Sequence, residues 1–284
     1  MRALRFSSVL GFEIDEATAD SINKNRGALE QVSVERIFSE LHKLLCGQQA
    51  ARVLREYQQV ICQIIPELKP CYMYEQHSRF HTLTLYEHIV TAVENIPPEA
   101  ELRLAMLFHD IGKPLTQSED EKGAWHYYGH AEKSAELAEQ IMKRLKTSTA
   151  LRERVCDIVR YHGLEANNKD KFIRRQLAKH GIELFRGIML AHIADDSAKA
   201  EFAKERIPLW REIIRRAEEI SEQQPCLSIS QLAINGADLK ALIPPSPKLG
   251  EALQYLLDGV IDGRFPNERD TLFVQARKYL EETN

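Results

Sequence analysis

Apolar residues recur every three or four positions along almost the whole chain, and this spacing constrains the fold more than any other feature. It matches the 3.6-residue period of an α-helix, whereas runs that alternate between apolar and polar residues, as strands do, are nearly absent. Ile37, Leu41 and Leu44 illustrate the pattern, which Gly47 ends. The sequence therefore predicts an all-α fold, with a multi-helical central bundle flanked by helical segments.

Interruptions of the helical pattern divide the chain of 284 residues, which is long enough to bury a large core. Pro66 ends a helix expected at 49–65, and Gln223-Gln224-Pro225 interrupts the pattern again further on. We expect three parts: an N-terminal helical segment at 1–70, a central domain at 71–222 and a C-terminal helical tail at 223–284.

The composition narrows the possible partners and the compartment. The formal net charge of −4 excludes a surface that is basic overall, so any contact with RNA needs a local basic patch. The five cysteines show no regular spacing and fit reduced thiols rather than a disulfide framework. No apolar run approaches the roughly 18 residues that a membrane span requires. We therefore expect a cytoplasmic protein without a membrane partner.

An apolar helix expected at 99–111 ends in the dipeptide His109-Asp110, after which Gly112 and Pro114 stop the helical pattern. A charged side chain at a buried helix end is costly unless it has a partner, and a divalent metal ion is a suitable one. In the alternative interpretation, His109 caps backbone carbonyls and Asp110 is solvated. Further ligands elsewhere in the chain would favour the metal.

Two other expected helices offer such ligands. His88 lies among apolar neighbours in the middle of one helix, and Asp195 follows an apolar run on another, next to Asp196, which we expect to be solvated. The alternative for His88 is a core histidine with a single hydrogen bond. Two imidazoles and two carboxylates suit Mn²⁺, Fe²⁺, Co²⁺, Ni²⁺ or Zn²⁺. Water bound to such an ion ionises near neutral pH and attacks phosphoesters.

Two further histidines are candidates for holding a second ion. His130 begins one expected helix and His162 ends another, so each is either a metal ligand or a helix cap. If both are ligands, Asp110 bridges two metal ions. Lys113 lies one turn beyond Asp110, where it either holds a substrate phosphate or is an ordinary surface lysine. We therefore expect one or two divalent transition-metal ions and a phosphoester or nucleotide substrate.

The order of these residues along the chain resembles the HD superfamily of metal-dependent phosphohydrolases over about 80–199. The resemblance implies a core ligand set of His88, His109, Asp110 and Asp195, with His130 and His162 as the additional ligands of two-metal members. It also implies hydrolysis of a phosphomonoester or a cyclic nucleotide phosphodiester. In that reaction we expect Asp110 and Lys113 to be catalytic.

The two ends of the chain resemble bacterial tRNA nucleotidyltransferases, the CCA-adding enzymes and their poly(A) polymerase relatives. The resemblance rests on Leu10-Gly11-Phe12 and Glu35-Arg36 near the N-terminus and on Ile234-Asn235-Gly236 and Asp238-Leu239 in the tail. It implies that the helical neck and tail bind tRNA. The glycine-rich turn, the D-x-D pair and the acidic-x-x-Arg element of the family's catalytic head do not appear. We therefore do not expect nucleotidyl transfer from this chain alone.

A local basic patch is the remaining candidate for RNA binding. Lys171, Arg174 and Arg175 lie on one short expected helix, where they either bind RNA or form a solvated face. The main hypothesis is an HD-type phosphohydrolase associated with tRNA 3′-end processing. The alternative is an RNA-binding portion of a tRNA nucleotidyltransferase whose metal site is silent or structural.

Overall fold

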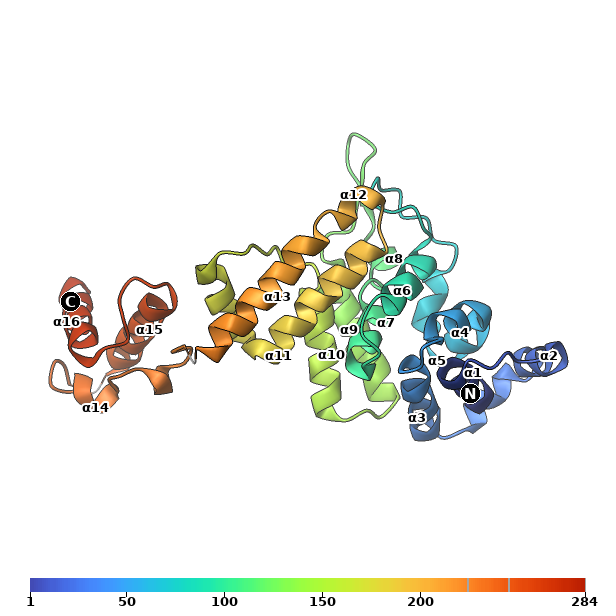
Figure 1. Ribbon diagram of the computed structural model, residues 1–284, viewed down its shortest axis with the longest axis horizontal. Coiled ribbons are helices and arrows are strands. Elements are labelled where there is room, and N and C mark those ends of the chain that lie inside the picture. The colour runs from blue at the N-terminus through green and yellow to red at the C-terminus, as the bar shows by residue number, and fades with distance from the viewer. Residues whose placement is uncertain (224, 245, 284) are drawn as a thin grey trace. The chain divides into compact units, whose positions relative to one another are not determined.

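The computed structural model describes residues 1–223, 225–244 and 246–283 (Figure 1). Helices make up most of it, which confirms the all-α prediction. The described residues form one small sheet, in which the two-residue strands β1 (Ser118–Glu119) and β2 (Trp125–His126) pair antiparallel. None of the described helices is long and apolar enough to cross a membrane. The interruption expected at 223–225 includes Gln224, which lies outside the described residues.

The chain forms two compact units, and each contains segments from separate parts of the sequence. The first comprises Met1–Leu164 and Gly187–Arg211, and the second comprises Glu165–Arg186 and the residues from Glu212 onward. The helices α11 (Asp170–Ser197) and α13 (Ile207–Glu222) contribute residues to both units. Within α11, Gly181 has φ 70° and ψ 167°, so the helix kinks at a glycine where the sequence predicts a break.

The N-terminal part of the first unit consists of short helices around α3. Its elements are α1 (Arg2–Leu10), α2 (Glu16–Lys24), η1 (Arg26–Gln31), α3 (Val34–Leu45), α4 (Ala50–Glu56), α5 (Gln58–Ile64) and η2 (Pro66–Cys71). Helix α1 packs against α3 and α4, and the side chains of Leu41 and Leu44 on α3 are fully buried. The single helix expected at 49–65 is in fact two helices, since the chain leaves the helical conformation at the buried Tyr57.

The rest of the first unit packs around α7. Its other elements are α6 (Leu85–Glu94), α7 (Ala100–Phe108), α8 (Lys113–Thr116), α9 (His130–Arg144), α10 (Thr149–Tyr161) and α12 (Glu201–Lys204). Helix α7 contacts α3, α6, α9 and α10, and its side chains from Leu102 to Phe108 are buried. The buried Arg103 guanidinium donates hydrogen bonds of 2.6 Å to the backbone oxygens of Leu45 and Gly47, which fixes α7 against the end of α3.

The turn that follows α7 approaches the start of α9 so closely that it requires a glycine. A Cβ atom on Gly112 would lie 2.8 Å from the backbone oxygen of His130 and 2.9 Å from Ser134 Oγ. Instead, Gly112 N donates a hydrogen bond of 2.9 Å to Ser134 Oγ. A larger residue would push α9 away, because packed backbone atoms leave no free volume. The approach brings His130 beside the turn that carries Asp110.

The second unit has its own apolar core. Its remaining elements are η3 (Ile229–Gln231), α14 (Gly236–Leu239), α15 (Pro247–Ile261) and α16 (Arg269–Glu282). Helices α15 and α16 pack against each other around Leu256, Leu272 and Ala276. The tail motif Asn235-Gly236-x-Asp238 is a capping box: the Asn235 side chain accepts hydrogen bonds from the backbone at the start of α14, and Asp238 Oδ2 accepts one from Asn235 N.

Candidate metal centre

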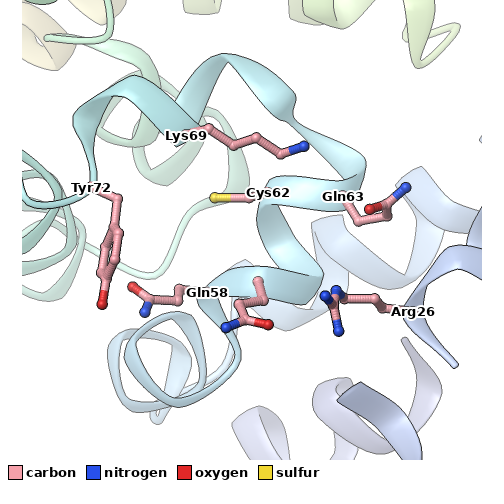
Figure 2. A pocket seen from close by; sticks show the side chains of 7 residues that line it. Arg26, Gln58, Cys62, Gln63, Lys69 and Tyr72 are labelled. Carbon is pink, nitrogen blue, oxygen red and sulfur yellow. The ribbon is translucent and has the colours of Figure 1, made fainter. Parts of the chain in front are cut away.

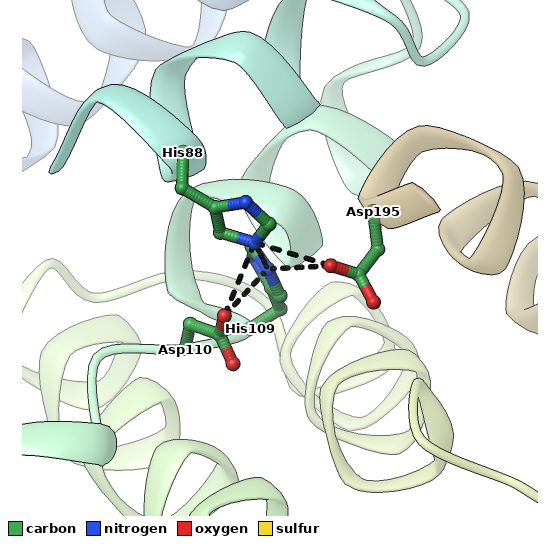
Figure 3. A group of neighbouring side chains, drawn as sticks. All are labelled: His88, His109, Asp110 and Asp195. Carbon is green, nitrogen blue, oxygen red and sulfur yellow. Dashed lines mark hydrogen bonds and ion pairs between the residues drawn. The ribbon is translucent and has the colours of Figure 1, made fainter. Parts of the chain in front are cut away.

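Four side chains from three parts of the first unit converge on one buried point (Figure 3). His88 comes from α6, His109 and Asp110 from the turn after α7, and Asp195 from α11. His88 Nε2 lies 3.2 Å from Asp110 Oδ2 and 3.1 Å from Asp195 Oδ1. His109 Nε2 lies 3.2 Å from Asp110 Oδ2. The four ligand atoms are all within 4.8 Å of one another, so the structure brings together the set that the sequence predicts.

The hydrogen bonds of the two imidazole rings fix where their protons are. His88 Nδ1 lies 3.2 Å from the backbone oxygen of Ala198, and His109 Nδ1 lies 2.7 Å from that of Met106. A carbonyl oxygen only accepts hydrogen bonds, so each Nδ1 carries a proton and each neutral ring leaves Nε2 as an acceptor. The two Nε2 atoms are 3.1 Å apart. Two nitrogen lone pairs and two carboxylate oxygens thus meet, an arrangement that a cation stabilises.

A second group uses the other oxygen of Asp110. His130 Nε2 and His162 Nε2 lie 3.4 Å and 3.6 Å from Asp110 Oδ1, and 3.3 Å from each other. Their Nδ1 atoms lie 2.8 Å and 2.7 Å from the backbone oxygens of Tyr127 and Val159. Both rings therefore bind backbone carbonyls, as the capping alternative expects, but only with Nδ1. Their Nε2 atoms remain available, and Asp110 lies between the two groups. We call these six side chains the Asp110 centre.

The electrostatics of the Asp110 centre favour the protonation states of metal ligands. Burial lowers the pKa of His109 and of His130, which keeps both rings neutral. Burial alone would raise the pKa of Asp110, but the charges of His109 and Lys113 hold it well below its usual range. Burial would also lower the pKa of His88, yet its hydrogen bonds to Asp110 and Asp195 outweigh burial and raise it. Without a metal ion, a proton on His88 thus offsets part of the carboxylate charge.

Two lysines pair with the carboxylates of the Asp110 centre. Lys113 Nζ lies 2.6 Å from Asp110 Oδ2 and 2.8 Å from Gln76 Oε1, and its side chain is only 6% exposed. It is therefore not the ordinary surface lysine of the alternative interpretation. Lys199 Nζ lies 2.5 Å from Asp195 Oδ2. Sequence reasoning missed Gln76, because a lone glutamine in an irregular stretch carries no pattern.

An open pocket of about 430 Å³ leads to the Asp110 centre. Its walls include Lys113 and Lys199, the histidines at 81, 126, 130 and 162, and the aromatic residues Trp125, Tyr127 and Tyr128 of the β-hairpin and the loop after it. The Tyr127 hydroxyl donates a hydrogen bond of 2.7 Å to the backbone oxygen of Gln76, which holds this loop against the irregular stretch before α6. Solvent and small ligands therefore reach the centre from one side.

Asp196 is not solvated, contrary to the expectation from the sequence. Its side chain is 2% exposed. Trp210 Nε1 donates a hydrogen bond of 2.7 Å to Asp196 Oδ2, and the Arg206 guanidinium donates one of 2.5 Å to Oδ1. Asp196 therefore fastens α11 to the start of α13. No sequence signal reveals this, because both donors lie more than two helical turns further along the chain.

The residues expected to bind RNA lie in the second unit and already have partners there. Lys171 Nζ lies 3.0 Å from Asp262 Oδ2, and Arg175 Nε lies 2.7 Å from Asp262 Oδ1. The side chains of Lys171 and Arg175 are each 56% exposed. Arg174 Nε, by contrast, is buried without a hydrogen-bond partner among the described residues. The basic patch is thus partly neutralised by one aspartate at the end of α15.

Two family models match the chain. The one described as "tRNA nucleotidyltransferase domain 2 putative" matches residues 116–276, and the one described as "Probable RNA and SrmB-binding site of polymerase A" matches residues 11–71. Both describe regions of tRNA nucleotidyltransferases or polymerase A, so the resemblance to the HD superfamily stays a prediction.

Relatives match over almost the whole chain. It is 31% identical to the CC-adding tRNA nucleotidyltransferase of Thermus thermophilus and 29% identical to the A-adding tRNA nucleotidyltransferase of Deinococcus radiodurans, in each case over 99% of its own length. It spans 65% and 68% of the lengths of these two proteins. The crystal structure of the CCA-adding enzyme of Bacillus stearothermophilus in complex with CTP has a similar fold, with a TM-score of 0.65 and 21% identity over 99% of this chain and 62% of that one.

These comparisons correct the main functional hypothesis. The relatives are named for the addition of nucleotides to tRNA rather than for hydrolysis, so the assignment as an HD-type phosphohydrolase with a phosphoester substrate is wrong. The error has a physical origin, because a cluster of metal ligands indicates what binds there and not which reaction follows. The alternative agrees better with the relatives. With a family model that covers more than half of its residues, the chain belongs to the tRNA nucleotidyltransferase family.

Proposed function

We propose that this chain binds tRNA as the RNA-binding part of a tRNA nucleotidyltransferase. The observation that carries the proposal is the similarity to the CC-adding and A-adding enzymes over 99% of the chain. The match of residues 11–71 to an RNA-binding region of polymerase A supports it. In this proposal the segments 1–70 and 223–284 flank the central domain 71–222, and both segments contact tRNA.

The proposed tRNA contacts must be local, because the net charge of the chain is −4. Lys171 and Arg175 are suitable, because each is more than half exposed while its ion pair with Asp262 holds it in place. Arg174 lies on the same helix with one guanidinium nitrogen still without an acceptor. We expect these three side chains to contact phosphates rather than base edges, since cations read the backbone without regard to sequence.

The affinity for an unmodified tRNA transcript, measured against salt concentration, tests this proposal. We expect binding at low salt that weakens steeply as salt rises. The K171A/R175A variant is expected to bind less tightly and with a shallower salt dependence. A matched control is K133A/K204A, which removes two charges from exposed helical ion pairs elsewhere in the chain. Absence of tRNA binding at low salt would refute the proposal.

We also propose that the Asp110 centre binds divalent metal ions in this protein. The supporting observation is that Asp110 Oδ1 and Asp195 Oδ1 are buried without hydrogen-bond partners among the described residues, while the Nε2 atoms face them. The mixed nitrogen and oxygen ligands suit Mn²⁺, Fe²⁺, Co²⁺, Ni²⁺ or Zn²⁺. Bound there, an ion would neutralise the carboxylates and cross-link α6, α11 and the turn after α7. The ligands themselves are held in place by the backbone carbonyls that bind each Nδ1.

Elemental analysis after gel filtration tests the metal proposal. We expect protein loaded with each of the five ions in turn to retain at least one of them, at up to two ions per chain. The variant D120A provides the control, because Asp120 forms an exposed pair with His126 and belongs to neither ligand group. It should retain the same amount of metal as the unaltered protein. Protein that retains none of the five ions would contradict the proposal.

A further inference from the structure

A second polar hollow lies in the N-terminal part of the first unit, apart from the Asp110 centre (Figure 2). It has a volume of about 360 Å³ and is formed by η1, α5, η2 and the residue that follows η2. The side chains that line it are those of Arg26, Gln58, Gln59, Cys62, Gln63, Lys69 and Tyr72. We call it the Arg26 pocket. Figure 2 shows Tyr72 and Arg26 on opposite sides of it, with the Cys62 sulfur between them.

The charge of the Arg26 pocket is one-sided. Its lining contains two cations and no carboxylate. Most other arginines and lysines of the first unit lie within 4 Å of an acidic side chain, whereas neither Arg26 nor Lys69 forms an ion pair with a described residue. Arg26 Nη1 donates one hydrogen bond of 2.6 Å to the backbone oxygen of Asn23, which orients the guanidinium. Two cations on one hollow without a counterion indicate an anionic ligand.

The neutral side chains of the Arg26 pocket narrow the ligand class. Gln58 and Gln59 carry amides, which form paired hydrogen bonds with base edges. Gln63 Nε2 donates a hydrogen bond of 2.7 Å to Glu30 Oε1 at the rim, which holds that side chain in place. The Tyr72 ring is 50% exposed and packs edge-on against the buried Tyr86, with 6.4 Å between ring centres. Its orientation is therefore fixed, as a stacking platform for a base requires.

We propose that the Arg26 pocket holds a single nucleotide of a bound RNA, with its phosphate between Arg26 and Lys69 and its base against Tyr72, within reach of the glutamine amides. The inference rests on the proposed tRNA binding and assigns a place to one part of it. The volume suits the proposal, because pockets for small organic ligands begin at roughly 300 Å³. A free inorganic anion would use the cations but would leave the amides and the ring without a role.

Three variants test the Arg26 pocket by their affinity for a tRNA transcript. R26A/K69A removes both phosphate contacts, and we expect a loss of at least about tenfold with a salt dependence reduced by one to two contacts. Y72L removes the ring, and we expect a loss of about five- to 100-fold, because one stacked base contributes that much. Y72F keeps the ring and is expected to bind as the unaltered protein does.

The matched control is K24A/K43A, which removes two exposed positive charges from neighbouring helices that do not line the pocket. If R26A/K69A and Y72L bind tRNA as tightly as this control, the pocket assignment is wrong while the proposed tRNA binding stands. If the unaltered protein does not bind tRNA, the proposed function fails and the assignment with it. Circular dichroism on each variant excludes unfolding as the cause of a loss.

The Cys62 thiol gives a direct measure of occupancy, since it lies at the floor of the Arg26 pocket. Burial raises its pKa, so alkylation by iodoacetamide is slow and is followed by mass spectrometry over hours. We expect saturating tRNA to slow alkylation of Cys62 at least about fivefold and to leave that of Cys46, which lines none of the pockets described above, unchanged. Equal protection of both cysteines, or of neither, would overturn the assignment.

Discussion

The Asp110 centre and the Arg26 pocket are two polar regions of the same unit with opposite deficits. In the Asp110 centre, carboxylate oxygens and imidazole Nε2 atoms meet with too few donors, so a cation completes it. In the Arg26 pocket, cations and amides meet without a carboxylate, so an anion completes it. The ligand class of a polar site therefore follows from which half of each pair the protein leaves out, and burial of one half alone is costly.

The first way to break this comparison is to remove the residue shared by both ligand groups. D110A takes away one oxygen from each group, and we expect metal affinity to fall by more than about 100-fold at both. D110N is the matched control for shape, because it keeps the side-chain volume and removes the charge. Both variants should keep the helical circular dichroism spectrum of the unaltered protein.

Elemental analysis after gel filtration measures the result of the D110A test. The expected outcome is a loss of all bound metal, in contrast to the D120A control. Retention of one ion per chain by D110A would show that Asp110 is not shared between the two groups. The Arg26 pocket should be unaffected, so the affinity of D110A for tRNA should lie close to that of the unaltered protein.

The second prediction uses an aspartate with the opposite environment on the same helix. Asp195 Oδ1 lacks a hydrogen-bond partner, whereas both oxygens of its neighbour Asp196 accept hydrogen bonds. D196A would leave the buried Trp210 Nε1 without an acceptor, which lowers the free energy of unfolding by about 1–3 kcal/mol. Urea denaturation followed by tryptophan fluorescence measures this. Metal content should not change, and a loss of metal without a loss of stability would contradict the contrast.

The sequence was sufficient to predict the metal ligands, because they break the pattern around them. A histidine or aspartate on an apolar helix face has no ordinary explanation, and His88, Asp195 and the pair His109-Asp110 all stand out in this way. The all-α fold follows from the same periodicity. The shared position of Asp110 was also predictable, once two further histidines offered themselves at helix ends.

The remaining features depend on directions and contacts that periodicity does not contain. Adjacent residues on a helix point about 100° apart, so Asp195 and Asp196 face different neighbours, and the sequence does not say which. The break at Tyr57 has no glycine or proline to mark it. The Arg26 pocket depends on that break, because α5 begins there, and its lining of glutamines and single cations looks like any solvated surface. Sequence reasoning therefore found the cation site and missed the proposed anion site.

The smallest predicted effect separates the two regions by pH. Metal ions and protons compete for imidazole nitrogen. The carboxylates raise the pKa of His88 above its usual value of 6.5, so in the metal-free protein His88 already takes up a proton above that pH. Burial lowers the pKa of His109 and His130, so these rings stay neutral over the same range.

Metal affinity should therefore fall by about tenfold for each pH unit below the raised pKa of His88, the slope of a single competing proton, and should level off above it. Competition with a chromophoric chelator between about pH 6 and pH 8.5 measures the slope. A slope of two or more protons would show that His109 or His130 also titrates there. The lining of the Arg26 pocket contains neither histidine nor carboxylate, so the ratio of tRNA affinities between the unaltered protein and R26A/K69A should stay constant over this range. A ratio that changed with the metal affinity would mean that the two regions are coupled.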